Sequence, residues 1–391
     1  MAATTALRRS GVNKLGVVIA ALTVLGLVLP FASVRPNRIV PGHGRMVLES
    51  LPMQPAVIFL AALVVMAAIA LFRTSAPVRL LSGLGALCVL IIAVGRAATF
   101  LTPAGDKLAR VSPGAGFWVL LFAFGILVAD ALVQLKPKPL TRIGVLALLG
   151  MVLAVILFSG ALADLSVFKE YANRADAFWR ESGTHVMLAF GSLAAALIVG
   201  VPLGIASVRL KRLRTVTLNV LNVIQTIPSI ALFGLLIPPL AWIALHVPGA
   251  AAIGISGIGT APALLALFGY SLLPVVANTV IGILGVPEAV NDAARGMGMT
   301  DGQRLRSVEL PLAFPVVLTG IRIVLVQNIG LATIAALIGG GGLGVFVFQG
   351  IGQTAMDLVL LGAVPTVILA FASAIVLDAF VELAQRPMST E

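Results

Sequence analysis

The 391-residue sequence is 60% hydrophobic and only 10% charged, whereas an ordinary soluble domain has about 25% charged residues. A membrane-spanning helix needs about 20 consecutive apolar residues, so this composition excludes a soluble enzyme and predicts a multi-pass membrane protein. The net charge of +11 comes with few aromatic residues and no long basic run, which argues against nucleic-acid binding. Cys88 is the single cysteine, so neither an intrachain disulfide nor a cysteine metal site can form.

Five apolar segments come first in the chain, separated by charged residues. Each has about the length of a tilted membrane-spanning helix. They are residues 15–34, 55–72, 80–95, 114–135 and 143–163. The basic residues before the first segment also resemble the start of a secretory signal. The long apolar run and the lack of a clear cleavage site favour a membrane anchor instead.

A polar stretch at residues 164–183 follows, and its charged and aromatic side chains suit the membrane surface. It separates an N-terminal hydrophobic half, residues 1–163, from a C-terminal half, residues 184–391. The two halves show no convincing internal repeat. No role can be derived for the N-terminal half.

Five further apolar segments lie in the C-terminal half, at residues 186–208, 216–247, 261–284, 314–338 and 356–381. The second of them contains Pro228, Pro238 and Pro239, which predict a kinked or broken helix. The chain is therefore expected to be an all-α integral membrane protein with about ten transmembrane helices.

The distribution of lysine and arginine predicts the orientation. Most of the 26 basic residues, including Arg79, fall in loops on one side if both termini are cytoplasmic. Arg35, Arg38 and Arg45 are the exception and make the first segment the weakest part of this topology. Arg322 lies within a segment, and we expect its side chain to reach the cytoplasmic surface.

A cytoplasmic loop at residues 285–313 is long enough to form structure of its own. Pro287 suits the first turn of a short helix that Gly296 and Gly298 end. Small apolar residues form a stripe along this helix: Ala289, Val290, Ala293, Ala294 and Met297. A partner protein could cover the stripe, with Ala293 and Ala294 deep in a groove and Asp292 and Arg295 beside it. The helix could equally pack only on its own bundle.

A second short helix is expected in the same loop. Thr300 and Gln303 have capping-box spacing. Leu310 is expected to be its last residue, because Pro311 disfavours continuation of a helix.

The loop also carries a family signature. Its members are Asp292, Ala293, Ala294, Gly298, Val308, Leu310 and Pro311. Their spacing resembles the EAA signature of permease subunits of binding-protein-dependent ABC importers, with Asp292 in place of the usual Glu and Val308 in place of the usual Ile. The resemblance implies a five-helix permease core at residues 184–386, and a loop that couples the permease to a separate ATP-binding subunit. It also implies a second permease subunit and a soluble solute-binding protein in a bacterial cytoplasmic (inner) membrane.

Two further stretches, residues 222–236 and 337–351, are similar to permeases for glycine betaine, choline and related osmoprotectants. The second is rich in glycine: Gly339, Gly340, Gly341, Gly342 and Gly344. These residues supply the backbone freedom for a sharp re-entrant turn, which we expect at the outer mouth. Methionine or another small solute is the alternative substrate within the same class.

Nucleotide hydrolysis needs a phosphate-binding pattern such as G-x-x-x-x-G-K-[ST], and the chain has no Gly-Lys pair. We therefore expect no cofactor and no enzymatic activity here, with ATP bound by the partner subunit. Ser256 lies in a G-x-S-G arrangement, which raises the alternative of an intramembrane protease. The three histidines all precede Ser256, unlike the rhomboid pattern, so a simple turn is expected.

An ion-coupled secondary transporter is the stronger competing interpretation. Such carriers usually hold ionisable residues near the bilayer midplane, whereas Asp130, Asp357 and Asp378 lie toward the ends of their segments. Four uncharged polar residues are candidates for a passage between two permease subunits: Gln225, Asn278, Gln327 and Asn328. Each could also serve as a hydrogen-bonded contact between helices.

Overall fold

The structure is a computed structural model that describes residues 11–37, 40–103, 105–106 and 108–385. Both termini and Arg38 lie outside the described residues. The chain divides into two compact units. The N-terminal unit runs to Lys138 and resumes at Ala147–Asn173, and the C-terminal unit takes Pro139–Leu146 and everything from Arg174 onward.

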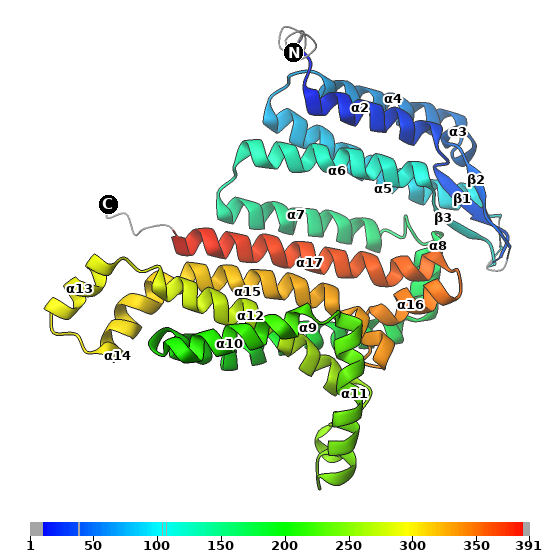
Figure 1. Cartoon of the computed structure of the whole chain (residues 1–391). Helices are drawn as coiled ribbons and strands as arrows, with labels where there is room; N and C mark the ends of the chain where they lie inside the picture. Colours follow the sequence, from blue (N-terminus) through cyan, green and yellow to red (C-terminus); the bar gives the residue numbers. More distant parts are fainter. Residues whose placement is uncertain (1–10, 38–39, 104, 107, 386–391) are drawn as a thin grey trace. The chain divides into compact units, whose positions relative to one another are not determined.

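The N-terminal unit is a helical bundle with a small sheet at one end (Figure 1). Among its long helices, α2 packs on α4 and α6, and α5 packs on α4 and α6. The helices are α2 (Lys14–Val28), α3 (Val47–Ser50), α4 (Met53–Leu71), α5 (Ala76–Leu101), α6 (Ala115–Leu135) and α8 (Ser166–Asn173). Helix α7 (Pro139–Phe158) contributes its first turns to the C-terminal unit and the rest to this one.

A small three-stranded sheet accompanies the helices of the all-α membrane fold that the sequence predicts. Strands β1 (Ala32–Arg35), β2 (His43–Arg45) and β3 (Arg110–Pro113) are ordered β2-β1-β3, with β1 antiparallel to both neighbours. The first apolar segment is therefore helical only to Val28. Pro30 disfavours the helical conformation of Leu29, which is extended, and the chain turns into β1.

Glycines allow α2 and α6 to approach closely. A Cβ atom on Gly116 would lie 2.4 Å from the carbonyl oxygen of Gly26, and one on Gly26 would lie 2.7 Å from the side chain of Leu120. Small residues at such crossings let two backbones pack where hydrophobic driving force between helices is absent. The buried faces of these helices, with Phe59 of α4 and Leu90 of α5, form the core of the unit.

The sequence predicted Arg79 in a cytoplasmic loop, but the residue lies in the first turn of α5. Its side chain is 1% exposed and forms an ion pair of 3.0 Å with Asp130 of α6. Asp130 also accepts a hydrogen bond from Gln134. A buried arginine requires such a partner, since an isolated charge would be costly in an apolar interior. The pair therefore fixes α5 against α6.

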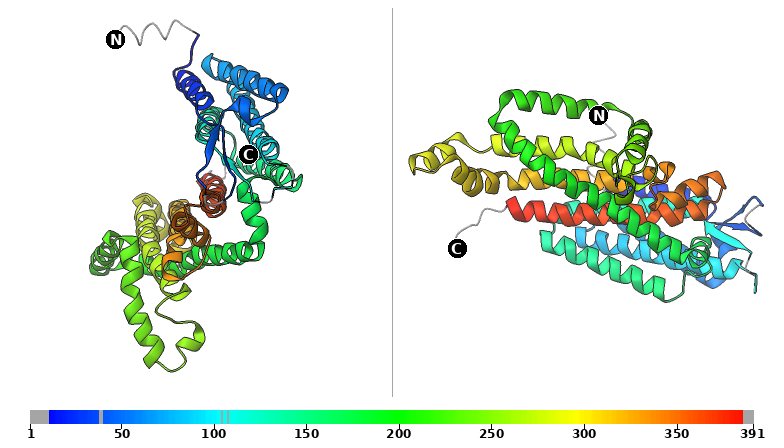
Figure 2. Two further views of the ribbon diagram at one scale, coloured as in Figure 1. Left: turned by 90° about the vertical axis from the view of Figure 1, so that its right-hand side faces the viewer. Right: turned by 90° about the horizontal axis from the view of Figure 1, so that it is seen from below.

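The C-terminal unit contains the remaining helices. They are α9 (Ala175–Arg209), α10 (Lys211–Thr226), α11 (Ser229–His246), α12 (Thr260–Leu284), α13 (Glu288–Gly296), α14 (Asp301–Arg304), α15 (Leu310–Ala332), α16 (Gly344–Gly352) and α17 (Met356–Gln385). Short 3₁₀ turns lie at Ala251–Ile253 and Ile334–Ile338. Helices α9, α12, α15 and α17 pack side by side. Helix α11 points away from them (Figure 1), and α13 and α14 extend past their end (Figure 2).

The broken helix predicted at residues 216–247 is confirmed. Helix α10 ends at Thr226, Pro228 caps the start of α11, and Pro238 and Pro239 lie inside α11. In the part of the chain that the structure describes, nine helices are long and apolar enough to span a membrane. The expected tenth, α2, has only 15 residues, short of the usual span length.

Arg322, whose side chain was expected to reach the cytoplasmic surface, is partly exposed and has an ionic partner on a neighbouring helix. Its guanidinium pairs with the carboxylate of Asp378 in α17. Asp378 also pairs with Arg142 at 2.9 Å, and Arg142 pairs with Glu382 at 2.8 Å. These four charges satisfy one another and link α15 and the first turns of α7 to α17.

The glycine crossing predicts the response of the N-terminal unit to one added methyl group. Gly116→Ala places that carbon against the backbone of α2 and should destabilise the unit by about 1–3 kcal/mol. Gly125→Ala, on the same helix, meets no atom within 4 Å and gains helix propensity. Thermal unfolding of the purified protein in detergent should show a lower midpoint for the first variant only. Equal midpoints would exclude a tight crossing.

Candidate functional site

Helix α13 is an exposed helix whose first turn follows Pro287, as the sequence predicts. The expected stripe of small residues is divided between two faces. Ala294 is 1% exposed and packs on its own chain. Ala289, Ala293 and Met297 face outward. The prediction that Ala293 and Ala294 enter a partner's groove together is therefore wrong for Ala294, and a partner can contact only the outward face.

Gly298 makes the reversal that ends α13. Its φ angle is +77°, a left-handed conformation that costs a residue with a Cβ atom about 1–2 kcal/mol. The N–H of Met299 then donates to the carbonyl oxygen of Ala294 at 3.1 Å, and the N–H of Gly298 donates to the carbonyl oxygen of Arg295 at 2.9 Å. On the exposed face Asp292 and Arg295 form an ion pair of 3.1 Å, so both predicted anchors lie at the surface.

The second arm of the loop begins as predicted and ends differently. Thr300 and Gln303 form the capping box. The helix does not stop at Leu310. Helix α14 continues through a π-helical turn, Leu305–Glu309, directly into α15. The N–H of Leu310 bonds to the carbonyl oxygen of Leu305, five residues earlier. The wider turn accommodates Pro311, which lies in the first turn of α15 and has no N–H to donate.

An ionic cluster that the sequence did not predict holds this arm to the bundle. Glu309 is buried and accepts from Arg304 Nε at 3.0 Å and from Arg209 Nη2, at the end of α9, at 2.8 Å. Arg304 also pairs with Asp301 at 2.8 Å. Residues 304 and 309 are five apart, a spacing that an α-helix does not bring together. The π turn aligns them, so only a prediction of that turn could have revealed the cluster.

Two of the four passage candidates form hydrogen bonds around Pro274 of α12. Pro274 has no N–H for the carbonyl oxygen of Tyr270, four residues earlier. Gln225 of α10 donates to that oxygen from Nε2 at 2.8 Å, and the Tyr270 hydroxyl donates to the carbonyl oxygen of Ile227. Asn278 donates to the carbonyl oxygen of Pro274 at 2.7 Å. Both amides therefore support the interrupted helix.

Asn328 lies at the centre of three helices. Its side chain is 0% exposed, and its Nδ2 lies 2.9 Å from the hydroxyls of Ser192 in α9 and Ser271 in α12. In this conformation Asn328 faces no passage, contrary to that interpretation. Gln327 is next in sequence but points elsewhere, into a cavity of about 640 Å³ between α15 and α17 that Arg322 and Asp378 also line. The four candidates do not form one site.

The glycine-rich turn is packed rather than free. Gly339, Gly341 and Gly342 have positive φ angles. Two side chains from one face of α9 bind the turn. Glu181 Oε2 accepts from the N–H of Gly342 at 2.8 Å, and His185 Nδ1 accepts from the N–H of Leu343 at 3.3 Å. Neither was predicted, although an acid and a histidine one helical turn apart at the start of an apolar segment could have been noticed.

The neighbouring glycines are fixed by close approach. A Cβ atom on Gly344 would lie 1.9 Å from the carbonyl oxygen of Thr333, and one on Gly340 would lie 2.9 Å from that of Ala335. The N–H of Gly259 donates to the carbonyl oxygen of Ile338 at 2.8 Å. The turn is thus tied to α9, to the start of α12 and to the end of α15. Ser256 donates to the carbonyl oxygen of Ile258 and belongs to a simple turn.

The Glu309 cluster predicts a strong effect of one neutral substitution. Glu309→Gln leaves two arginines without their buried counter-charge, and breaking such a pair costs about 3–5 kcal/mol. Asp301→Asn removes a carboxylate that is 83% exposed and should cost less than about 1 kcal/mol. Limited proteolysis of the detergent-purified protein should cleave the loop of the first variant faster. Identical cleavage of both variants would show that the cluster does not hold the loop.

Comparisons with known proteins agree with this architecture. Residues 13–168 match the family described as "ABC transporter permease YehY, N-terminal domain", and residues 192–390 match "Binding-protein-dependent transport system inner membrane component". The osmoprotectant import permease protein OsmW of Salmonella typhimurium is 44% identical over 50% of this chain and 83% of its own length. The glycine betaine/carnitine/choline transport system permease protein OpuCB of Bacillus subtilis is 36% identical over 54% and 87%.

Among solved structures, the chain is similar to one of the MetNI methionine ABC transporter in an inward-facing conformation. The similarity covers 55% of this chain and 99% of that one, with 25% identity and a TM-score of 0.48. The match at residues 192–390 spans half of the chain and contains the exposed loop and the helices that carry it. The chain is a multi-pass membrane protein and belongs to the family of binding-protein-dependent transport system inner membrane components, the permeases of ABC importers.

Proposed function

We propose that this permease imports quaternary-amine osmolytes such as glycine betaine or choline, driven by ATP hydrolysis in a partner subunit. The observation that carries the proposal is the exposed helix α13, which projects from the bundle (Figure 2). The Gly298 reversal follows it in the chain. The printed names of relatives at 36–44% identity support the substrate class. The chain itself is a transport subunit and not an enzyme.

The partners follow from this role. An ATP-binding subunit would contact the outward face of α13, at Asp292, Ala293 and Arg295. A second permease subunit, identical or different, would complete the passage, and a soluble solute-binding protein would deliver the solute outside. The protein would lie in the bacterial cytoplasmic membrane, with the loop and both termini in the cytoplasm.

The connection between α13 and the bundle suits the transmission of movement. From Asp301 the chain is helical without interruption to Ala332, so a displacement at the loop acts on the whole of α15. Glu309 links the same arm to the end of α9. Switching between two states requires contacts that differ in the two states. The outward face of α13 offers such contacts to the ATP-binding subunit without disturbing the buried cluster.

The passage would lie between two permease subunits. Gln225, Asn278 and Gln327 remain candidates to line it, since each is only half-buried, while Asn328 is a buried contact between helices. The glycine-rich turn, Gly339–Gly342 with Gly344, would act as an outer gate whose shape Glu181 and His185 maintain. Gly344 packs closely against the backbone of Thr333, directly after α15, so movement of α15 would act directly on the turn.

Selection of the solute belongs to another component. Quaternary ammonium groups are recognised by cages of aromatic side chains, and this chain has three Trp and two Tyr. One of the two tyrosines, Tyr270, is already bonded to the α10–α11 break. We therefore place the recognition of the osmolyte in the soluble binding protein.

Reconstitution tests the function directly. The test uses vesicles that contain this chain, its ATP-binding subunit and the binding protein. They should accumulate labelled glycine betaine or choline only when ATP is present on the side of the membrane where the loop and the ATP-binding subunit lie. Methionine should not accumulate. Accumulation driven by an ion gradient without the ATP-binding subunit would refute the proposal in favour of a secondary transporter.

The reversal after α13 predicts a selective loss of coupling. Gly298→Val introduces a β-branched residue at a left-handed position, while its side chain meets no neighbouring atom in this chain. The protein should insert normally but lose stimulation of the partner's ATPase by transport. Gly298→Asn, which tolerates this conformation, should retain it.

Gly296→Val is the matched control. A Cβ atom on Gly296 would also meet no atom within 4 Å, but Gly296 lies within α13 and its φ angle is negative. ATPase stimulation should be largely kept in this variant. If Gly298→Val kept full stimulation as well, the geometry of the reversal would have no part in coupling.

A further inference from the structure

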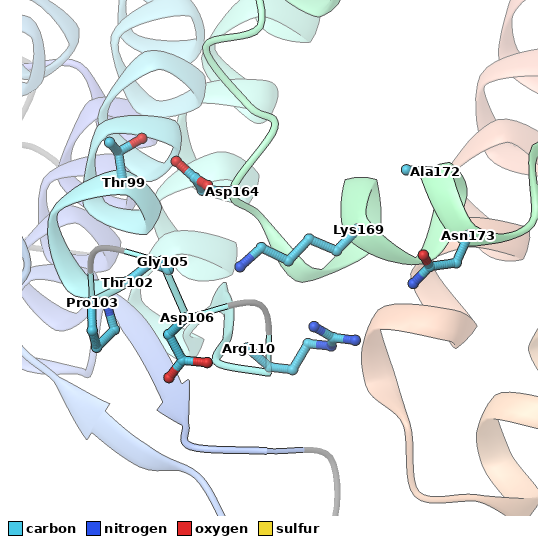
Figure 3. Close-up of a pocket in the computed structure, with 10 residues that line it drawn as sticks. All are labelled: Thr99, Thr102, Pro103, Gly105, Asp106, Arg110, Asp164, Lys169, Ala172 and Asn173. Carbon is cyan, nitrogen blue, oxygen red and sulfur yellow. The ribbon is translucent and has the colours of Figure 1, made fainter.

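The N-terminal unit contains a cavity of about 620 Å³, within the size range of small-molecule sites. Its wall is formed by the end of α5, the following loop, β3 and α8 (Figure 3). Charged residues of both signs line it: Asp106, Arg110, Asp164 and Lys169. Neither the family descriptions nor the permease mechanism assigns a role to this cavity.

The two basic groups that line the cavity, Arg110 and Lys169, differ in how they are bonded. Arg110 pairs with the buried Glu170 at 3.6 Å. Lys169 extends into the cavity in Figure 3, and its Nζ donates to the carbonyl oxygen of Ala109 at 3.1 Å. An ammonium group has three N–H donors, so two donors of Lys169 have no partner among the described residues. Thr102 adds a buried hydroxyl that has no hydrogen-bond partner in the described part of the chain.

The two acidic groups, Asp106 and Asp164, differ in how they are bonded within the described part of the chain. Asp164 forms no hydrogen bond or ion pair with the residues that the structure describes, and in Figure 3 it lies at the cavity on the side of Thr99. Asp106 accepts the N–H groups of Ala109 and Leu108. These bonds, followed by the charges of Lys169 and Arg110, hold the pKa of Asp106 below its usual value, so it is ionised at neutral pH.

The lining defines the kind of cation that fits. None of the described lining residues is aromatic, so a quaternary ammonium group would find no aromatic face. A protonated amine that carries N–H groups can instead donate charge-assisted hydrogen bonds to carboxylates. The lysine and the free hydroxyl can donate to a carboxylate of the ligand. A molecule with both groups satisfies both halves of the cavity.

We propose that this cavity binds a small zwitterion with N–H donors, of the α-amino acid class, with its ammonium group on Asp164 and its carboxylate on Lys169 and Thr102. This ligand differs from the transported quaternary amines, which have no N–H. The position of the site on the outer side of the membrane rests on the orientation proposed above, but binding itself does not depend on it.

The N-methyl series of glycine separates the two ligand classes. Glycine, sarcosine, dimethylglycine and glycine betaine keep the carboxylate and lose N–H donors one at a time. Titration calorimetry on the purified full-length chain, without ATP-binding subunit or binding protein, should show the tightest binding for glycine and progressively weaker binding to betaine. Asp164→Asn and Lys169→Met should each weaken glycine binding by about tenfold or more. Thr102→Val, close in shape, should weaken it less.

Glu49→Gln is the matched control, because Glu49 is an exposed acid of the same unit that pairs with Arg45 and does not line the cavity. It should bind glycine like the unaltered protein. The proposal is overturned if betaine binds as tightly as glycine, if no member of the series binds, or if either Asp164→Asn or Lys169→Met binds glycine like the unaltered protein. Uptake by the complete transporter is measured separately, so a failure of ATP-driven import would refute the proposed function and leave the binding result standing.

Discussion

Backbone hydrogen bonding in apolar surroundings is the constraint on which the C-terminal unit depends. A membrane offers no water to an N–H or carbonyl group that has lost its helical partner. At three interruptions of this bundle the chain supplies an alternative arrangement. Gln225 reaches the carbonyl oxygen that Pro274 leaves free, the π turn accommodates Pro311, and Glu181 and His185 accept the N–H groups of the glycine-rich turn. Breaks in helices therefore become fixed positions.

The same replacements determine where movement can occur. Helix α13 packs on its own chain through the small side chain of Ala294 and connects to α14 through the Gly298 reversal, whereas α14 and the π turn are held by the buried pair of Glu309 with Arg304 and by the bond of Glu309 to Arg209. The first connection can change shape at low cost, and the second resists change because separating buried charges is expensive. A partner that shifts α13 would bend the reversal first and then displace α15 and α9 together.

The sequence predicted the elements that depend on local composition. Apolar segments gave the spanning helices, the prolines gave the break before α11, and Thr300 with Gln303 gave the capping box. It failed where distant residues meet. Strands of three or four residues are too short to show a pattern, and the paired residues of β1 and β3 lie 75 to 81 positions apart. The pairs Arg79–Asp130 and Arg322–Asp378 join different helices. The role of Glu309 as the centre of an ionic cluster could be recognised only once the π turn was known. The burial of Ala294 depends on how α13 lies against its own bundle.

Polar side chains within the C-terminal bundle are mostly engaged in holding it together. Asn328 connects three helices, Gln225 and Asn278 support α12, and Arg322 is paired. Few groups are then left to select a solute, which agrees with a passage that becomes complete only against a second permease subunit and with selection by a separate binding protein. The N-terminal unit differs in this respect. Its cavity keeps a carboxylate without a partner in the described residues and an incompletely bonded ammonium group. Since unsatisfied charges of both signs in one cavity favour a ligand that neutralises both, the capacity for direct solute recognition lies in the unit that the coupling mechanism does not use.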